Sequence, residues 1–492
     1  MVRSWRYLSS YAEFVRPVAS ERIIVVMKTI CTYAITTAAL LQLSACTVGP
    51  DYSKPTNENL DLPISYGQFG DPAFVSGKSD LRNWWTVFND PTLEELIEKA
   101  RVENRDLRVA VSRVQQARLR VDLAQASRSP QVSVAAGATT NEDGQISSNI
   151  GLQASWDLDI FGKVARQIES EDAAYQATEE DRRDIQVSLF AQVAQSYLSV
   201  RSLQAQLHAA QQNIESQKEI LKLTEVRFDN GISSGLDVSQ AKQVLASSQA
   251  SVPALRIALA QNINTIAVLV GTHPQGLHVD LREPKPIPVP PSTITVGLPA
   301  QLLRQRPDIR SAERNIAAQS AKVGVATADL YPSFTLNGNL GFASTDGNLF
   351  DAANRSFALG PSLQWSIFDG NRVRNQIKFE EFGLEQAVLI YEGTVLKALE
   401  ETESAMTAFI EQRIEADATN RSAQAARTTM QLGTQAYKDG LVGFQDVLSA
   451  QQKLFSEDIR EAKSRGLASQ NLVSLYKALG GGWNPDQSET ID

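Results

Sequence analysis

The chain has 492 residues, a formal net charge of −9 at neutral pH and 42% hydrophobic residues. This length and composition are typical of a folded protein with one large domain or several small ones. The acidic balance argues against a nucleic-acid partner. Three His and two Cys leave little material for a metal site or a thiol enzyme, so neither a metal nor another cofactor is expected.

Residues 1–45 are predicted to be a signal peptide that starts at Met27, with 1–26 as an extension that the pattern does not explain. Lys28 precedes a small, apolar stretch that is too short to span a membrane stably. Small residues then precede Cys46, as in signals where the cysteine is diacylated and becomes the first mature residue. The alternative is an ordinary signal peptide with an incidental cysteine. The pattern predicts an exported protein with a lipid on Cys46.

Residues 46–90 are rich in Pro, Gly and Asp and show no hydrophobic period. We expect an extended, lipid-anchored tether here. The first helix is predicted to begin after Asp90, because Asp is a good capping residue and Pro91 suits the first helical position.

The rest of the chain contains an internal repeat. Two pairs of matching residues lie 202 positions apart, Asp106 with Asp308 and Pro130 with Pro332. Three further pairs lie 209 positions apart, Gly231 with Gly440, Asp237 with Asp446 and Gly271 with Gly480. The first copy spans 91–283, a Pro-rich connector spans 284–299, the second copy spans 300–483, and 484–492 form a C-terminal tail. Each copy is predicted to contain a helix, two short strands, a long helix, a tight tip and a returning helix.

Between Gly162 and Leu269 the hydrophobic pattern is that of a coiled-coil hairpin. Apolar residues recur at every seventh position on both legs: Val200, Leu207, Ile214, Leu221 and Phe228, then Val238, Leu245, Val252, Leu259 and Ile266. Such a repeat keeps one seam facing a partner helix when the helices wind around each other. A long solvated hairpin with no role in transport is the alternative.

Three of the four predicted strands alternate between apolar and small or polar residues. They cover residues 150–160, 333–342 and 356–367, whereas the strand at 131–139 is weak. Strands of about ten residues with one apolar face fit a transmembrane barrel with a wet lumen. A soluble sandwich gives the same alternation.

Four strands cannot close a barrel, because about eight is the practical minimum for a membrane barrel. An open sheet edge in lipid would leave backbone groups unpaired. If these strands cross a membrane, the chain must oligomerise, and the strand count permits a dimer, a trimer or a larger ring.

Several short motifs stand out along the chain: the lipid-attachment pattern followed by Thr47-Val48-Gly49-Pro50-Asp51-Tyr52, the Trp84-Trp85 to Asp90-Pro91 start, Gly297-Leu298-Pro299, Arg306-Pro307-Asp308-Ile309, Phe161-Gly162 and Phe368-Asp369-Gly370. They resemble the motifs of the TolC-like outer membrane factors, and most closely those of the NodT-type lipoproteins of resistance-nodulation-division efflux systems. The resemblance covers essentially all of the mature chain.

The resemblance implies a mainly α-helical protein with a membrane β-barrel. Three copies would form a twelve-stranded barrel in the outer membrane, continued into the periplasm by a twelve-helix tunnel. Such proteins are passive exit ducts that dock through a periplasmic adaptor protein onto an inner-membrane, proton-driven pump. They are anchored in the outer membrane by their lipid.

The two tips are candidate adaptor-docking surfaces. Their residues include Gly231, Ser234 and Gly235 in the first copy and Gly440 and Gly443 in the second. Tight reversals between helices need glycine because it tolerates positive φ, so the tips could also be plain turns. Their position at the end of a long hairpin in both copies, together with the resemblance, favours docking.

Asp446 matches the position of a gate aspartate in the family, where three copies would form a carboxylate ring that attracts cations and resists anions. Asp237 and Tyr437 match a pair that latches neighbouring helices. The alternative for both carboxylates is a favourable interaction with a helix N-terminus. Two departures weaken the gate assignment: Val442 stands where some relatives carry a latch arginine, and Ser449 where some carry a second aspartate.

Rival functions remain at this stage. No grouping of nucleophile, His and acid appears, and His208, His273 and His278 lie apart in sequence, so an enzyme is not expected. A periplasmic structural lipoprotein would explain the hairpins but not the apolar alternation of the strands. A duct for secreted polypeptides is the alternative within transport.

Overall fold

The computed structural model describes residues 47–55, 62–67, 70–77, 81–277, 281–297, 299–345 and 348–484. The predicted signal peptide, Cys46, His278 and most of the C-terminal tail therefore lie outside the described residues. The helices are α2 (Pro91–Glu103), α3 (Arg105–Ala126), α4 (Lys163–Asp229), α5 (Gly235–Leu269), α6 (Pro299–Gln305), α7 (Pro307–Ala328), α8 (Arg372–Lys438) and α9 (Phe444–Ala478), with short 3-10 turns η3 (Trp84–Phe88), η4 (Pro274–Gly276) and η5 (Ala352–Asn354). The strands are β1 (Phe74–Ser76), β2 (Gln131–Thr140), β3 (Ile146–Leu158), β4 (Ile294–Val296), β5 (Ser333–Ser344) and β6 (Arg355–Gln364).

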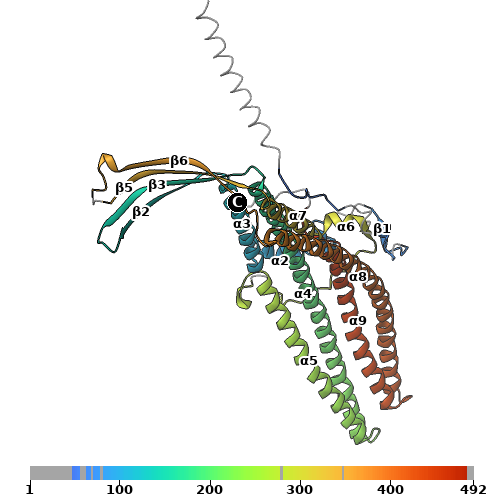
Figure 1. Ribbon diagram of the computed structural model, residues 1–492. Helices are drawn as coiled ribbons and strands as arrows, with labels where there is room; N and C mark the ends of the chain where they lie inside the picture. Colours follow the sequence, from blue (N-terminus) through green and yellow to red (C-terminus); the bar gives the residue numbers. More distant parts are fainter. Residues whose placement is uncertain are drawn as a thin grey trace, which may run out of the picture. The chain divides into compact units, whose positions relative to one another are not determined.

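The two copies of the repeat have matching helix lengths. Helices α3 and α7 have 22 residues each, α4 and α8 have 67 each, and α5 and α9 have 35 each. In Figure 1, α5 runs back alongside α4 and α9 alongside α8. The mainly helical fold with long hairpins and four longer strands confirms the predicted fold class.

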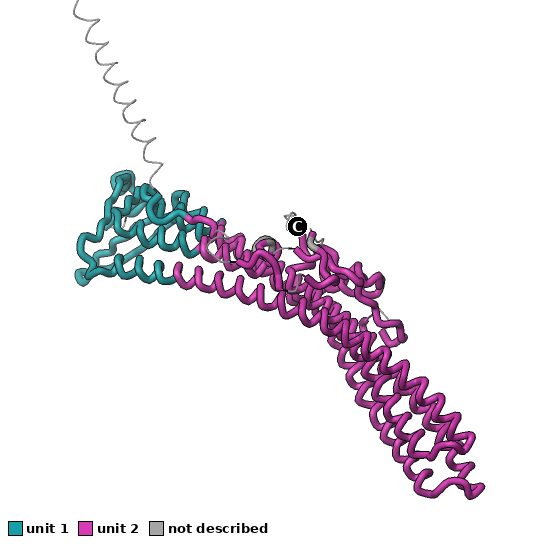
Figure 2. The backbone as a smooth tube through the Cα atoms, turned by 90° about the vertical axis from the view of Figure 1, so that its right-hand side faces the viewer, with its two compact units in different colours: residues 1–51, 122–170, 319–383 teal, residues 52–121, 171–318, 384–492 magenta. Residues whose placement is uncertain are grey.

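The chain divides into two compact units, which Figure 2 colours separately. Unit 1 contains residues 122–170 and 319–383 together with the start of the described chain, and it holds the four-stranded sheet. Unit 2 contains residues 52–121, 171–318 and 384 onward, and it holds most of the long helices and the main apolar core.

The unit 2 core shows that the second half of the predicted tether is folded. Tyr66, Phe74 and Trp84 are almost fully buried, and the indole of Trp84 stacks on Tyr476 of α9 with ring centroids 5.5 Å apart. Strand β1 pairs in parallel with β4 of the connector. This part of 46–90 is therefore packed against the core, in contrast to the extended tether that we expected. The sequence did not indicate this, because the apolar residues of the segment follow no hydrophobic period and each packs separately. The predicted start of α2 is confirmed, since the Asp90 carboxylate accepts hydrogen bonds from two amides of its first turn.

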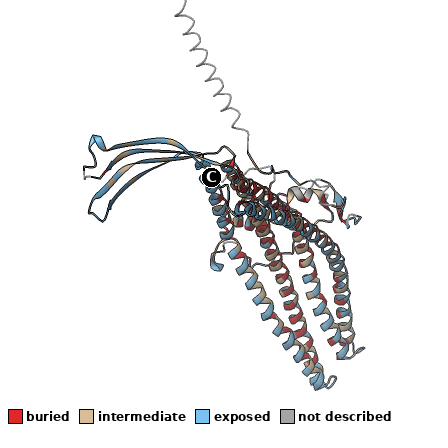
Figure 3. Ribbon diagram, viewed as in Figure 1, coloured by how far each residue is buried: buried red, intermediate tan, exposed pale blue. Residues whose placement is uncertain are grey.

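The coiled-coil seam is buried or partly buried along most of its length, and Figure 3 shows buried residues distributed along both hairpins. Ile214 of α4 and Val252 of α5 form a cluster with Ala210, and Leu207 and Leu245 pack against it. Val200 and Ile266 lie in the main core. Phe228, the last seam position of α4, is 47% exposed, so this helix presents an aromatic side chain at its tip.

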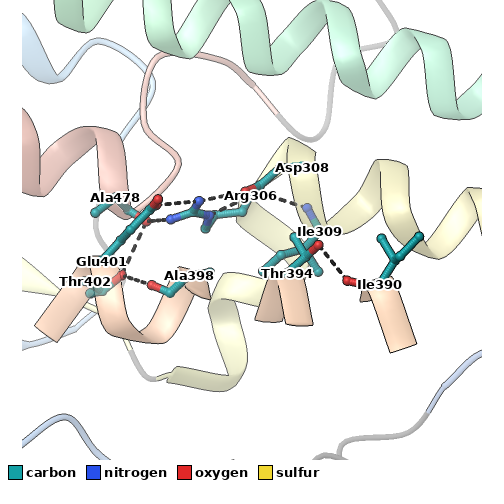
Figure 4. Close-up of polar contacts among 9 residues, drawn as sticks. All are labelled: Arg306, Asp308, Ile309, Ile390, Thr394, Ala398, Glu401, Thr402 and Ala478. Carbon is teal, nitrogen blue, oxygen red and sulfur yellow. Dashed lines mark hydrogen bonds and ion pairs between the residues drawn. The ribbon is translucent and has the colours of Figure 1, made fainter. Parts of the chain in front are cut away.

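The connector motif joins the start of the second copy to its end, as Figure 4 shows. The Arg306 guanidinium donates to the Asp308 carboxylate, to Glu401 of α8 at 2.8 Å and to the carbonyl oxygen of Ala478, the last residue of α9, at 3.0 Å. Burial alone would lower the pKa of Arg306, but its bonds to Asp308 and Glu401 hold that pKa above the ordinary value. This explains why the motif combines an arginine with an aspartate two residues later.

The first copy has a simpler contact at the same place. Asn104, which lies 202 positions before Arg306, donates from Nδ2 to the carbonyl oxygen of Leu269 at 2.8 Å. Leu269 is the last residue of α5 and lies 209 positions before Ala478. In both copies a side chain in front of the shorter helix therefore binds a free carbonyl at the end of the returning helix.

Candidate functional site

The sheet of unit 1 has one apolar and one polar face. Its strand order is β2-β3-β5-β6, with all neighbours antiparallel. One row of directly paired residues crosses all four strands: Val134, Leu152, Leu340 and Phe357. All four side chains are exposed. The weak strand prediction at 131–139 underestimated β2, which is a full strand of ten residues.

The opposite face of the sheet carries hydroxyl, amide and carboxylate groups. Thr335 donates to Asp157 at 2.8 Å, and the Asn337 amide donates to Ser362 at 2.9 Å. The sheet thus has the two-sided character that the alternation predicted. Strands β2 and β6 are the edges, and neither has a further strand partner among the described residues.

A tryptophan fixes the same end of the sheet in each copy. The Trp156 indole donates to the carbonyl oxygen of Arg128 at 2.9 Å, and the Trp365 indole donates to that of Leu330 at 3.1 Å. These four residues are related by the repeat offsets. Interfacial Trp is a common feature of membrane barrels, because the ring is apolar while its N–H needs a partner.

The start of the described chain is clamped beside this sheet. Arg166 is a buried residue at the start of α4. It donates to the carbonyl oxygen of Val48 at 3.1 Å and forms an ion pair with Asp51 at 2.6 Å. The amide of Val48 donates to the carbonyl oxygen of Phe161, which follows β3. Gly49 has φ +94°, and a side chain there would meet the backbone of Gly324. These contacts explain the Val-Gly-Pro-Asp motif and hold the residues after Cys46 in place.

Both hairpin tips use the same reversal. At the end of α4 the amide of Ile232 donates to the carbonyl oxygen of Arg227 and Gly231 donates to Phe228; at the end of α8 the amide of Leu441 donates to Ala436 and Gly440 donates to Tyr437. This is the Schellman arrangement, in which the glycine has a positive φ. Gly231 has φ +71° and Gly440 has φ +74°. Sequence reasoning therefore identified the correct glycines for the turns.

The five residues predicted for adaptor docking are all exposed: Gly231, Ser234, Gly235, Gly440 and Gly443. Large apolar side chains stand beside them, with Ile232 64% and Leu441 78% exposed. The tips therefore present solvent-facing apolar groups on a rigid turn.

Asp237 caps α5 in a reciprocal arrangement. Its carboxylate accepts from the Ser234 amide at 3.0 Å, and the Ser234 hydroxyl accepts from the Asp237 amide at 3.2 Å. Ser233 also donates to the carboxylate. Partial burial raises the pKa of Asp237, but the bonds from Ser234 and Ser233 outweigh it and hold this pKa below its ordinary value. The helix-capping alternative for Asp237 is therefore present in the structure.

Asp446 is exposed near the start of α9. Its carboxylate accepts from the Gly443 amide at 3.2 Å, and Gly443 offers no side chain in return. Ser449, one turn further along, is also exposed. Asp446 is thus free to present charge to solvent while it caps the helix.

The structure does not bring the Tyr437 hydroxyl and Asp237 together within one chain. The hydroxyl is buried and has no hydrogen-bond partner among the described residues. Tyr437 instead meets a residue that sequence reasoning missed: the guanidinium of Arg227, in the last turn of α4, lies over the Tyr437 ring at 4.5 Å and donates to the Tyr437 carbonyl oxygen at 2.9 Å. An arginine before the tip glycines was the only available signal, and nothing in the sequence paired it with a residue 210 positions away.

An apolar cluster surrounds this contact. It contains Ile220, Ala241, Met430, Tyr437, Phe444, Val447 and Leu448, with Val442 packed against it. The cluster draws residues from all four hairpin helices, so the two tips are held together by packing. Val442, where the resemblance had led us to note the lack of an arginine, is an apolar contact of this cluster.

Comparisons with known proteins agree with this architecture. The family described as "Outer membrane efflux protein" matches residues 96–272 and 298–481. The cation efflux system protein CusC of Escherichia coli O6:H1 is 31% identical over 460 residues, which cover 90% of this chain and 97% of that protein. Nodulation protein T of Rhizobium leguminosarum bv. trifolii is 31% identical over 462 residues, which cover 90% of this chain and 96% of that protein.

Solved structures give the same result. The outer-membrane channel OprN has a TM-score of 0.83 and 36% sequence identity, and the match covers 89% of this chain and all of that one. The family match includes both copies of the repeat, with their tips and their strands. The expected resemblance is confirmed: the chain belongs to the outer membrane efflux protein family, and it is the outer membrane channel component of a tripartite efflux pump.

Proposed function

We propose that three copies of this chain form a passive duct for small molecules, with a shared barrel of twelve strands in the outer membrane and a helical tunnel in the periplasm. The observation that carries this proposal is the open sheet, whose edges β2 and β6 have no further strand partner in the part of the chain that the structure describes and whose apolar face is exposed. Unpaired edge groups cost several kcal/mol each in lipid, whereas ring closure by other copies satisfies them.

The long helices support the same assembly. Only 17% of the most apolar stretch of α5 is buried within the single chain. Helix α8 carries exposed apolar side chains in its first half: Phe379, Phe382, Leu389, Ile390 and Leu396. Exposed apolar surface of this extent is typical of a protein–protein interface. Neighbouring copies in the trimer would cover these faces.

The tips dock a periplasmic adaptor protein, which connects the duct to an inner-membrane pump of the resistance-nodulation-division class. Support comes from the exposed turn glycines and from the apolar side chains beside them, Ile232 and Leu441. A rigid turn with exposed apolar anchors loses little conformational freedom on binding.

Asp446 forms a ring of three carboxylates at the periplasmic end of the tunnel. Its exposure and its single capping contact leave the charge available to ions. Such a ring attracts cations and resists anions.

The lipid on Cys46 anchors each copy next to the barrel. Support comes from the clamp on the following residues, because Thr47 packs directly against Gly162, which follows β3. Cys46 directly precedes Thr47 in the sequence, so a lipid on Cys46 would be attached one residue before this contact.

The test is single-channel conductance of the purified protein in planar bilayers, with its mass in detergent measured in parallel. We expect a trimer with a small conductance that Mg²⁺ blocks from the periplasmic side. Asp446→Asn should weaken the Mg²⁺ block, since it removes the charge and keeps an oxygen for the Gly443 amide. Asp439→Asn is the matched control, because Asp439 is an exposed carboxylate of the same tip. A monomer without conductance would refute the duct, and equal Mg²⁺ block in both variants would refute the Asp446 ring.

A further inference from the structure

Arg227 holds the end of one long helix against the end of the other. It lies in the last turn of α4, and its Nη1 donates at 2.9 Å to the carbonyl oxygen of Tyr437 in the last turn of α8. The same carbonyl accepts the amide of Gly440, which closes the turn of the second tip. A cation at a helix C-terminus is favourable, because the carbonyls there carry partial negative charge.

The guanidinium also lies over an aromatic ring. Its central carbon is 4.5 Å from the centre of the Tyr437 ring, and Tyr437 is only 3% exposed. An arginine over an aromatic face is attracted by the negative face of the ring, more so where water is excluded. Arg227 therefore contacts both the ring and the backbone of Tyr437.

The Tyr437 hydroxyl does not take part in this contact. It is buried without a partner among the described residues. The Tyr437 ring also packs against Phe444 in a T-shaped arrangement, with centroids 6.0 Å apart. The stabilising feature is thus an aromatic ring at 437, and the contact would not need the hydroxyl.

The contact also positions the candidate gate residue. Phe444 and Val447 flank Asp446 in the first turns of α9, and both are buried in the cluster that contains Tyr437. Asp446 itself is exposed. The Tyr437 ring therefore packs against the start of α9, the segment that carries Asp446.

Each chain has only one such contact in its described part. The residues 209 positions from the pair are Ala436 and Phe228, so the reverse contact, from α8 to α4, cannot form. Phe228 is 47% exposed, in contrast to buried Tyr437. The first hairpin supplies the cation and the second hairpin is the element that is held.

We propose that Arg227 is the positioning residue that keeps the duct closed, by holding the tip of the second hairpin against the first, and that opening requires the Arg227–Tyr437 contact to break. The inference rests on the proposed duct and on the Asp446 ring. It assigns closure to an aromatic and backbone contact of Arg227, in place of a bond between the Tyr437 hydroxyl and Asp237.

The test compares single-channel conductance of four variants in planar bilayers. Arg227→Ala and Tyr437→Leu should each raise the conductance at least about threefold, and the double variant should not exceed the larger single effect. Tyr437→Phe should match wild type, because it keeps the ring. Arg227→Lys should be intermediate, since it keeps the charge and loses the planar group. Arg256→Ala, which removes an exposed arginine from α5, is the matched control.

A purely structural role would change the trimer mass or the unfolding midpoint, so both are measured for every variant. If Arg227→Ala fails to assemble, Tyr437→Leu and Arg227→Lys decide the question. Tyr437→Leu keeps the arginine, and Arg227→Lys keeps both the positive charge and the ring. Open channels in Tyr437→Phe, or wild-type conductance in both Arg227→Ala and Tyr437→Leu, would overturn the inference. If the Mg²⁺ block depends on Asp446 but the conductance is unchanged by substitution of Arg227, this inference is refuted and the proposed duct stands. Absence of any wild-type channel would refute the duct as well.

Discussion

The two copies of the repeat share their backbone and differ in the side chains that join them to their surroundings. Their helices have equal lengths, and their returning helices end on the same glycine turns, at Gly271 and Gly480. At the tip, the first copy presents Arg227 and an exposed Phe228 where the second has Ala436 and a buried Tyr437. The two hairpins thus share one shape, and they differ in their side chains. The first hairpin carries the arginine of the tip contact, and the second carries the tyrosine that the arginine holds.

The junction between the short helix and the returning helix gives the largest expected contrast. Arg306→Ala should lower the free energy of unfolding by about 3 kcal/mol, because it leaves Asp308, Glu401 and a buried carbonyl without their shared partner. Asn104→Ala, at the matching place in the first copy, should cost about 1 kcal/mol, since it removes weaker, uncharged hydrogen bonds.

Thermal unfolding in detergent, followed by circular dichroism, measures this contrast. Arg256→Ala serves as the exposed-arginine control here too. Equal shifts for Arg306→Ala and Asn104→Ala would mean that the two junctions contribute alike and that the additional ion pairs of the second copy add nothing.

A second contrast concerns charge inside α4. Burial, and then repulsion from Asp308, raise the pKa of Asp184 to about 6, against an opposing effect of Arg306 and Lys477. Glycine stands 209 positions later, at Gly393, so the second copy has no counterpart. This charge is a feature of the first copy alone.

The consequence for stability follows from the direction of the shift. Because the folded-state pKa lies above the unfolded value of 3.8, the folded state binds the proton more tightly, and ionisation of Asp184 costs stability as pH rises from about 4 to 6. At pH 7.5 the cost is at most about 3 kcal/mol, at about 1.4 kcal/mol per pKa unit. Asp184→Asn should therefore raise the unfolding midpoint at pH 7.5 and leave it nearly unchanged at pH 4. A gain of equal size at both pH values would contradict this assignment.

The sequence predicted the repeated architecture well because repetition and hydrophobic period are local signals. The offsets of 202 and 209 residues identified both hairpins, and the tip glycines lie where the pattern placed them. The alternation in 333–342 predicted which residues of β5 share a face. Strand β2 was underestimated because its small Ala and Gly residues give little contrast, while its pairing with β3 supplies the missing stabilisation.

The contacts between distant segments could not be predicted in this way. Phe74 and Trp84 pack in the core, although residues 46–90 show no hydrophobic period that would have predicted their burial. Arg201, on α4, is fully buried and donates to the carbonyl oxygen of Glu283, and the heptad pattern contains no signal that pairs these two residues. Arg227 and Tyr437 each lie within a regular helix, and only the packing of the two hairpins brings them together.

The smallest expected effect tests the difference between the two helix caps. Ser234 caps α5 with its hydroxyl, whereas Gly443 has no side chain to cap α9. Loss of a Ser cap costs about 1 kcal/mol, while a glycine at this position is worse than Ser by only a few tenths. Ser234→Ala should therefore increase the opening of the first turn of α5, measured as faster amide hydrogen exchange of a tip peptide.

The opposite change in the second copy should strengthen its cap slightly. Gly443 has φ −79° and ψ 164°, which any residue can adopt, and a side chain there would meet only Asp446, at 3.9 Å. In Gly443→Ser the new hydroxyl can accept the Asp446 amide and complete the arrangement already half formed by the Asp446 carboxylate. Exchange at the start of α9 should slow two- to threefold, as expected for a few tenths of a kcal/mol. If exchange there becomes faster instead, the bare glycine is itself required at the second tip, and the two tips differ in function as well as in capping.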